Sequence, residues 1–294
     1  MVYDRSRYVN QPETLKRMSR QATARHPDGA TALPVTEIES WSGDPNFMSS
    51  LARGLAVVRG FSQENRSMSV SQLSQKTGIP RAAVRRCLYT LEKMGYVSSG
   101  DGSQYALRPK LLGLGHAYLS STPMVVTAQP FLDRVGEAVH ESCSMATLDG
   151  EEILYVARSV SSRIISMSLN VGSRLPAYCT SIGHILLAHL PAADLDDYLA
   201  NTSLKRFTER TVTSPGELRQ LLVTVREQGY AIADQQMELG VRSIAVPVRN
   251  SAGVVVAGIN VIVQTARGTM RDMKTRYLPP LRSAADDLGA QLPP

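Results

Sequence analysis

Apolar residues recur at helical spacing from about residue 50 onward, and this periodicity marks where regular structure is expected to begin. Leu51, Leu55 and Val58 are separated by three or four positions, which gathers apolar side chains on one face of a helix. The pattern predicts a first helix that packs through these three residues. Residues 1–48 show no sustained periodicity and mix Arg, Ser, Thr, Pro and Gly, so we expect a flexible N-terminal arm.

Two further helices follow in close succession, and capping signals mark their ends. Ser69, with Gln72 three residues later, forms a capping-box sequence that starts a helix. Gly78 supplies the left-handed conformation that a helix C-terminus favours. Pro80 suits the start of the next helix, where its missing N–H is not needed. The third helix is predicted to run from about Pro80 to Met94.

The third helix divides into an apolar face and a polar face. Val84, Cys87, Leu88 and Leu91 share the face that is expected to pack on the first two helices. The opposite face opens with the small Ala82, so it can approach the DNA major groove closely and still reach base edges or phosphates with guanidinium groups. The alternative is a solvated basic face on an ordinary bundle helix. The residues expected to contact DNA are Arg81, Ala82, Arg85, Arg86 and Tyr89.

A β-hairpin is predicted directly after the third helix. Two short alternating segments, 95–97 and 104–107, surround an Asp101-Gly102 turn. A hairpin in this position is the wing of a winged helix-turn-helix. The pattern therefore predicts a winged helix-turn-helix DNA-binding domain over residues 49–108, followed by a linker helix within residues 109–123.

Residues 124–294 change character and mix helices with strands. Strands in hairpins, with helices between them and at both ends, are typical of an antiparallel α+β domain rather than a parallel dinucleotide fold. No Walker A or GxGxxG sequence is present, and no cofactor is expected. The predicted helices span residues 124–140, 182–190, 195–199, 215–228 and 270–288. The predicted strands span residues 142–148, 153–159, 164–169, 230–233, 243–248 and 254–263.

The net positive charge of the chain resides in the predicted DNA-binding domain. Residues 49–111 contain ten Lys or Arg and three Asp or Glu, a net charge of +7, whereas the whole chain has +6. Residues 1–48 are neutral, and residues 112–294 have a net charge of −1. One small basic domain on an otherwise neutral chain is the electrostatic pattern expected of a protein that binds a phosphate backbone through one module.

Bulk composition excludes several other classes of protein. Of the 294 residues, 43% are hydrophobic and 20% charged, as in soluble globular proteins. No apolar run approaches the roughly 20 residues that span a bilayer, and the N-terminus lacks the apolar region of a secretory signal. The three cysteines Cys87, Cys143 and Cys179 are far apart and form no CxxC pair, which argues against disulfides and a zinc site. We expect a cytoplasmic protein with no membrane partner and no metal.

Two segments resemble the IclR family of bacterial transcriptional regulators. These are residues 163–183, RIISMSLNVGSRLPAYCTSIG, and residues 239–248, LGVRSIAVPV. They are similar to the branch that regulates protocatechuate, 4-hydroxybenzoate and β-ketoadipate catabolism. The resemblance covers about residues 49–290. It implies a GAF-like effector-binding domain over residues 124–294, a palindromic double-stranded operator, and a homodimer or dimer of dimers. It also implies RNA polymerase as a partner if the protein is an activator.

The resemblance also implies an effector pocket between the central sheet and the loop that opens the following helix. That loop is here residues 180–183, which face Asp234, Ser243, Asn260 and Ile262. Other members often have Cys at the position of Ser243 and a hydroxyl residue at that of Ile262. These departures favour a less polar ligand than glyoxylate or pyruvate, and so a small aromatic acid, with a dicarboxylic acid next.

Elementary chemistry supports a carboxylate at the start of that helix. The backbone N–H groups of Ser181 and Ile182 are expected at a helix N-terminus, where unsatisfied donors and the helix dipole favour an anion. Arg163 and Arg174 flank the loop, and each is either a carboxylate clamp or a partner in a surface salt bridge. Tyr178 either stacks on a ligand ring or packs in the core.

Two functions of other classes remain open from the sequence. The first is an enzyme with Cys179 as its nucleophile and His184 or His189 as its base, although the sequence shows no third group that orients either histidine. The second is a DNA-binding protein whose large domain only oligomerises. No catalytic residue is assigned.

Overall fold

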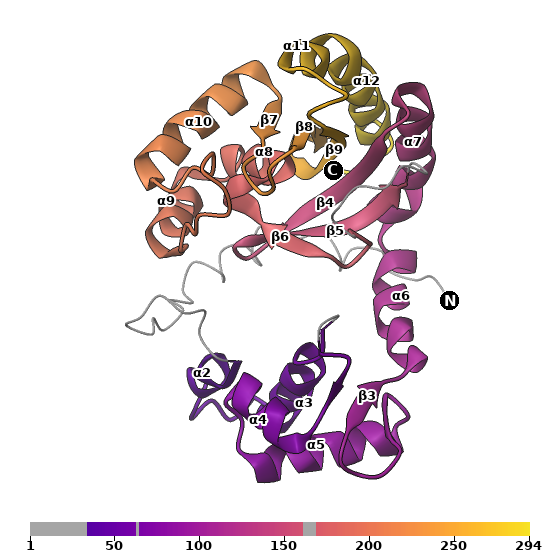
Figure 1. The fold of residues 1–294 in the computed structure, drawn as a ribbon, viewed down its shortest axis with the longest axis vertical. Helices are drawn as coiled ribbons and strands as arrows, with labels where there is room; N and C mark the ends of the chain where they lie inside the picture. Colours follow the sequence, from indigo (N-terminus) through magenta and orange to yellow (C-terminus); the bar gives the residue numbers. More distant parts are fainter. Residues whose placement is uncertain (1–33, 63–64, 161–168) are drawn as a thin grey trace, which may run out of the picture. The chain divides into compact units, whose positions relative to one another are not determined.

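A computed structural model describes residues 34–62, 65–160 and 169–294 of the chain. The chain forms two compact units that meet at residues 118 and 119, and each is described by itself (Figure 1). The predicted arm over residues 1–33 and most of the strand predicted at 164–169 lie outside the described residues. Within these described ranges, no helix is both long enough and apolar enough to cross a membrane.

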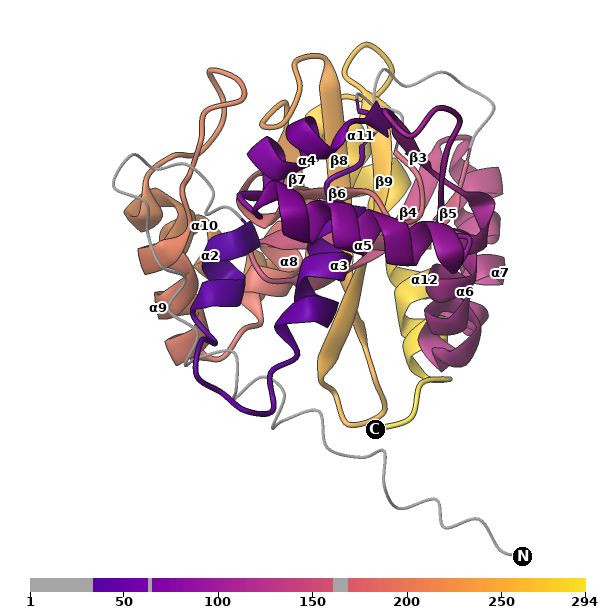
Figure 2. The ribbon, with the colours of Figure 1, turned by 90° about the horizontal axis from the view of Figure 1, so that it is seen from below.

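The N-terminal unit is a helix-turn-helix with a small antiparallel sheet. In Figure 2, α5 of this unit faces the viewer. The predicted hairpin is confirmed, and β1 joins it to give the strand order β1-β3-β2. The helices are α2 (Pro34–Glu39), α3 (Ser49–Arg59), α4 (Val70–Thr77) and α5 (Arg81–Lys93), followed by a 3₁₀ turn (Pro109–Leu111) and α6 (Leu112–Ser121). The strands are β1 (Ser67–Met68), β2 (Val97–Ser99) and β3 (Tyr105–Leu107).

Two predictions for this unit are wrong. Residues 34–48 are not part of a flexible arm, because α2 buries Ile38 in the same core as Leu73 and Leu88. The core face of α3 is also different from the one predicted. Leu51 and Leu55 are 58% and 54% exposed.

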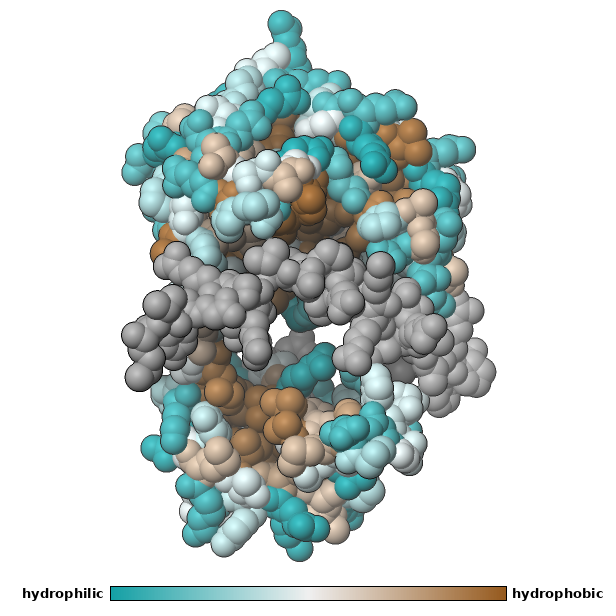
Figure 3. Space-filling model, turned by 180° about the vertical axis from the view of Figure 1, so that it is seen from behind, coloured by the Kyte–Doolittle hydropathy of each residue, from teal (hydrophilic) through white to brown (hydrophobic). Residues whose placement is uncertain are grey.

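The buried face of α3 instead carries small residues that allow α4 to approach closely. Ala56 and Val57 are buried. A Cβ added to Gly60, at the end of α3, would lie 2.8 Å from Leu73 Cδ2. The side chains of Leu51 and Leu55 thus remain at the surface of this unit, part of which is apolar in Figure 3.

The C-terminal unit is a six-stranded antiparallel sheet with helices on both faces, as predicted for an α+β domain. Its strand order is β6-β5-β4-β9-β8-β7. In Figure 1, α7 and α12 lie on one side of this sheet, and α8, α9 and α10 lie on the other. The helices are α7 (Pro123–Val139), α8 (Ser181–Ala188), α9 (Ala192–Asn201), α10 (Pro215–Gln228), α11 (Met270–Asp272) and α12 (Leu278–Gly289). The strands are β4 (Ser142–Asp149), β5 (Glu152–Ser159), β6 (Arg174–Pro176), β7 (Ala231–Asp234), β8 (Val241–Arg249) and β9 (Val255–Gln264).

The last predicted helix is interrupted rather than continuous. A π-helical segment, Met273–Tyr277, separates α11 from α12. Two prolines at the start of α12, Pro279 and Pro280, explain the break, because neither can donate the backbone hydrogen bond that would continue an α-helix from the preceding turn.

The pairing register of the strands decides which side chains lie on each face of the sheet, and the two faces differ in character. Met145 pairs with Ile259, and both pack in the core beneath α7 and α12. The neighbouring pair, Ser144 and Asn260, points to the opposite face because side chains alternate along a strand. That second face lies towards α8 and contains the candidate cavity.

Candidate functional site

Hydrogen bonds fix the turn between α4 and α5. The Ser69 hydroxyl accepts from Gln72 N at 3.2 Å, and Gln72 Oε1 accepts from Ser69 N at 2.8 Å, so the predicted capping box is confirmed. Gly78 is left-handed, with φ of 73°. Ser74 Oγ then donates to Ile79 O at 2.7 Å across the turn. These contacts set the direction in which α5 leaves.

The outward face of α5 is free to meet a partner. Val84 and Leu88 are fully buried, and Ala83, Cys87 and Leu91 pack half-buried against the same core, so the opposite face of the helix is turned outward. Among the described residues, none of the arginines on this face forms an ion pair. The predicted DNA-contacting residues are all exposed: Arg81, Ala82, Arg85, Arg86 and Tyr89.

The wing is held by its own turn and by a contact to the end of α5. Asp101 Oδ1 accepts from Ser103 N at 2.9 Å, and Gly102 adopts a φ of 76°. The hydrogen bonds from Ser103 hold the pKa of the Asp101 carboxyl below its usual value. Lys110 Nζ donates to Met94 O at 2.8 Å, which ties the end of the hairpin to the end of the helix.

A cavity of about 40 Å³ lies on the α8 side of the sheet. Its walls are largely apolar, with polar groups at a few points. This volume holds a few water molecules, whereas a dry cavity that binds benzene measures about 150 Å³, so an aromatic ligand needs the walls to move apart. The lining residues are Tyr155, Leu169, Leu175, Cys179, Thr180, Ala233, Gln236, Met237, Glu238, Val241, Ser243, Asn260 and Ile262.

Three of the effector-site residues inferred from the sequence come together in this cavity. Ser243 on β8 pairs with Ile262 on β9, and Asn260 is two residues away on the same face. Thr180, the N-cap of α8, also lines the cavity and accepts from Gly183 N at 3.2 Å. Arg163 lies outside the described residues.

The residues at the start of α8 are packed in the core rather than open to the cavity. Ser181 and Ile182 are fully buried and do not line the cavity. A Cβ on Gly258 would lie 2.9 Å from Ile182 Cγ2, so α8 presses directly on β9 there. The absence of a side chain at Gly258 is what lets the helix approach.

The remaining predicted effector residues have other partners. Arg174, on the edge strand β6, forms ion pairs with Asp149 at 2.6 Å and Glu152 at 2.8 Å, the surface alternative considered for it. Tyr178 is buried, and its phenol donates to Lys205 O at 2.8 Å, which is the packing role. Neither residue lines the cavity.

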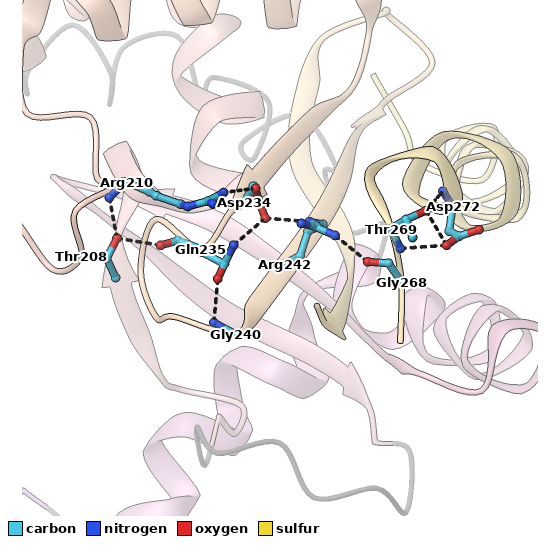
Figure 4. Close-up of polar contacts among 9 residues, drawn as sticks. All are labelled: Thr208, Arg210, Asp234, Gln235, Gly240, Arg242, Gly268, Thr269 and Asp272. Carbon is cyan, nitrogen blue, oxygen red and sulfur yellow. Dashed lines mark hydrogen bonds and ion pairs between the residues drawn. The ribbon is translucent and has the colours of Figure 1, made fainter. Parts of the chain in front are cut away.

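Asp234 holds the cavity wall in place without lining it. Its two carboxylate oxygens accept from Arg242 Nε at 2.7 Å and from Arg210 Nη1 at 2.6 Å (Figure 4). Gln235 follows with a φ of 59°, and its Oε1 accepts from Gly240 N at 3.1 Å. The network therefore fixes the turn between β7 and β8, which contributes Gln236, Met237 and Glu238 to the cavity.

Sequence reasoning missed five polar residues at or beside the cavity. Tyr155, Gln236 and Glu238 line it, whereas Ser144 and Arg158 lie on the same face of the sheet, paired with each other across β4 and β5. The alternation of Ser142 and Ser144 with apolar residues on β4 was the available signal, since it places hydroxyls on one face of a buried strand.

The geometry around Cys179 does not support a nucleophile. Burial raises the pKa of its thiol to about 12, so the thiolate is absent at neutral pH. Its sulfur contacts Met237 Sδ at 3.5 Å. His184 Nε2 bonds Tyr178 O at 2.7 Å, and His189 bonds Ile185 O through Nδ1 and the Arg249 guanidinium through Nε2. Among the described residues, neither ring bonds Cys179.

A winged helix-turn-helix joined to an α+β unit with a partly open cavity defines a DNA-binding transcriptional regulator. Two family models match this chain. The IclR helix-turn-helix domain matches residues 50–100, and the bacterial transcriptional regulator IclR C-terminal domain matches residues 116–290. The chain belongs to the IclR family, and the resemblance inferred from the sequence is confirmed.

Individual relatives agree with this assignment. The chain is 49% identical to the Pca regulon regulatory protein of Pseudomonas putida, over 93% of this chain and 94% of the relative. It is 33% identical to the p-hydroxybenzoate hydroxylase transcriptional activator of Acinetobacter baylyi, over 83% and 91%. A crystal structure of an IclR homolog from Microbacterium hydrocarbonoxydans, complexed with 4-hydroxybenzoate, is 27% identical with a TM-score of 0.69, over 82% and 97%.

Proposed function

We propose that this protein regulates genes of aromatic-acid catabolism in response to a small aromatic acid bound in the cavity on the α8 side of the sheet. The observation that carries the proposal is the combination of apolar walls, such as Leu175 and Val241, with Ser243 and Asn260 as polar partners. Apolar walls suit a ring, and a few convergent polar groups fix its orientation. The names of the relatives and the 4-hydroxybenzoate complex support the same class of ligand.

Protocatechuate and 4-hydroxybenzoate are the first effectors to test, followed by β-ketoadipate. Calorimetry and thermal shift on the full chain measure binding of each. We expect at least one of them to bind and to raise the melting temperature of the C-terminal unit. If none of the three binds while glyoxylate or pyruvate does, the protein is a regulator of another small-carboxylate pathway. If no carboxylate binds, the C-terminal unit serves only in oligomerisation.

On the DNA side, α5 enters the major groove of an operator. Arg86 and Arg85 reach bases or phosphates, while Arg81, Ala82 and Tyr89 complete the contact surface. One such helix reads only a few base pairs, so two symmetric half-sites and a two-fold oligomer, a homodimer or a dimer of dimers, are needed for specificity. Light scattering gives the mass and footprinting the number of half-sites. A monomer that protects a single half-site contradicts the proposal.

The proposed protein is a cytoplasmic regulator and not an enzyme. Its operator lies in the bacterial cytoplasm, and the buried, protonated Cys179 supplies no activated nucleophile. If effector binding activates transcription, RNA polymerase is a further partner. A reporter fusion with and without effector distinguishes activation from repression.

A further inference from the structure

Three polar side chains form a row across the centre of the sheet. Arg158 on β5 pairs with Ser144 on β4, and Ser144 pairs with Asn260 on β9. Residues paired in this way point to the same face of a sheet, here the face that contains the cavity. Neighbouring strands lie about 4.8 Å apart, so the two ends of the row are separated by about 10 Å at the backbone. We call Arg158, Ser144 and Asn260 the polar row.

The polar row contains buried polar atoms that lack partners within the described part of the chain. These are Ser144 Oγ, Asn260 Oδ1 and Arg158 Nε, together with Oε1 of Gln236 in the cavity wall. Ser144 is fully buried and Asn260 is 3% exposed. A buried polar atom without a hydrogen bond is costly and rare in native proteins. Several such atoms on one face of a sheet, beside a cavity, point to a polar ligand.

Arg158 supplies a charge that forms no ion pair with any described residue. Its Nη1 donates to Leu169 O at 2.6 Å, which is a neutral partner. Burial lowers the pKa of this guanidinium, and only the Tyr155 phenol acts in the opposite direction. A guanidinium stays protonated in proteins, so a partly dehydrated positive charge remains beside the cavity.

The two ends of the polar row call for opposite hydrogen-bonding groups. Arg158 is only a donor. The Asn260 side chain already bonds the Tyr155 phenol, which leaves Asn260 Oδ1 and Gln236 Oε1 as the acceptors without a partner among the described residues. Ser144, between the ends, can do either. A ligand that satisfies all of them has an anionic acceptor at one end and a hydroxyl donor at the other, with an apolar body against Ile262.

We propose that Arg158 binds the carboxylate of a hydroxylated aromatic acid whose ring hydroxyl donates to Asn260, so that the effector lies across β4 and β9. This assignment rests on the proposed function, in that the effector is an aromatic acid. Asn260 belongs to the pocket that the family resemblance implies, but the carboxylate lies away from the start of α8, where helix N-terminus chemistry favoured it. There, Ser181 and Ile182 are fully buried, and Ile182 occupies the space above Gly258.

The test compares an acid with its neutral amide in calorimetry on the full chain. The ligands are 4-hydroxybenzoate and 4-hydroxybenzamide, which differ in charge and not in ring or hydroxyl. We expect Arg158→Gln to lower the affinity for the acid tenfold or more and to change that for the amide less than twofold. The matched control is Arg134→Gln, on α7 at the other face of the sheet, where Arg134 is 62% exposed at its side chain. This control leaves both affinities unchanged.

The outcomes separate this inference from the proposed function. If the wild-type chain binds no aromatic acid, the proposed function fails. If it binds 4-hydroxybenzoate but Arg158→Gln keeps the acid affinity, or loses acid and amide equally, the role of Arg158 is refuted while the function stands. If Arg158→Gln does not fold, Arg158→Lys retains the charge without the planar fork and is expected to show an intermediate loss for the acid only. No loss in Arg158→Lys also refutes the inference.

Asn260 is tested by removing the hydroxyl from the ligand. Asn260→Ala is expected to weaken 4-hydroxybenzoate about tenfold relative to its own effect on benzoate, because only the hydroxylated ligand has a donor for Oδ1. If Asn260→Ala weakens the binding of both ligands equally, the ring hydroxyl does not bond Asn260, and that contact of the proposal is refuted.

Discussion

Arg242 Nε donates to Asp234 Oδ1 at 2.7 Å between neighbouring strands, β8 and β7, directly beside the candidate effector cavity. The guanidinium of Arg242 also donates to Gly268 O, so one side chain connects the end of β7 to the loop before α11 (Figure 4). Burial alone would raise the pKa of Asp234, but the hydrogen bond and charge of Arg242 outweigh it and keep the carboxyl ionised. The ion pair of Asp234 and Arg242 thus holds a wall of the cavity in place, although neither residue lines the cavity.

Asp234→Asn is expected to destabilise the C-terminal unit by about 2–3 kcal/mol, because it leaves the buried guanidinium of Arg242 without a counter-charge. The expected loss is at the low end for buried pairs, since Asp234 is partly exposed. Chemical denaturation measures it. Arg219→Gln, which removes an exposed pair with Asp196, is the control and should cost less than about 1 kcal/mol. Equal effects of the two variants would show that the Asp234 network does not stabilise the fold.

The buried His184 is expected to make stability depend on pH between about 6.5 and 4. Burial lowers its pKa to about 4 in the folded chain, whereas the unfolded residue titrates near 6.5. Between these values the unfolded state binds the extra proton, so the free energy of unfolding falls as the pH falls through this window, by about 3 kcal/mol in total. Denaturation at several pH values tests this, with His184→Gln as the variant that should lack the component. A His184 NMR titration near pH 6.5 would contradict it.

Arg86→Ala, and less strongly Arg85→Ala, are expected to weaken operator binding by about 1–3 kcal/mol each, the range for a guanidinium that reads a base. Both side chains are exposed on α5, so the melting temperature should change little. Fluorescence anisotropy with operator DNA at fixed salt measures the affinity. Arg59→Ala, at the end of α3, is the control, because it also removes one positive charge but lies outside α5. Unchanged affinity in both α5 variants would remove α5 as the reading helix.

Gly183→Ala is expected to destabilise the C-terminal unit by about 3 kcal/mol or more. The added Cβ would lie 2.0 Å from Ala177 O, which is backbone and cannot turn aside. Gly216→Ala, in the first turn of α10, meets its nearest atom only at 3.8 Å and should be neutral or stabilise by up to about 1 kcal/mol. Thermal unfolding of the two variants gives the comparison. A stable Gly183→Ala protein would show that α8 can move away from residue 177.

The sequence by itself determined the elements whose signals are local. The Ser69–Gln72 capping box and the Asp101-Gly102 turn occupy a few consecutive residues, and both were predicted with their helix and hairpin. The same holds for α10, whose predicted bounds match those of the structure. Ser243, Asn260 and Ile262 were reached through a motif resemblance, since no spacing in the sequence brings β8 and β9 together.

Only the tertiary structure decided which faces are buried and which side chains meet. Leu51 and Leu55 have the spacing of a core face, but Gly60 brings α4 against the other side of α3. Arg174 and Arg158 are indistinguishable as nearby arginines in the sequence, yet one pairs with Asp149 and Glu152 at an edge strand and the other lies in the polar row. The physical reason is that strand register is set by pairing between distant segments, and a shift of one residue turns every side chain to the opposite face.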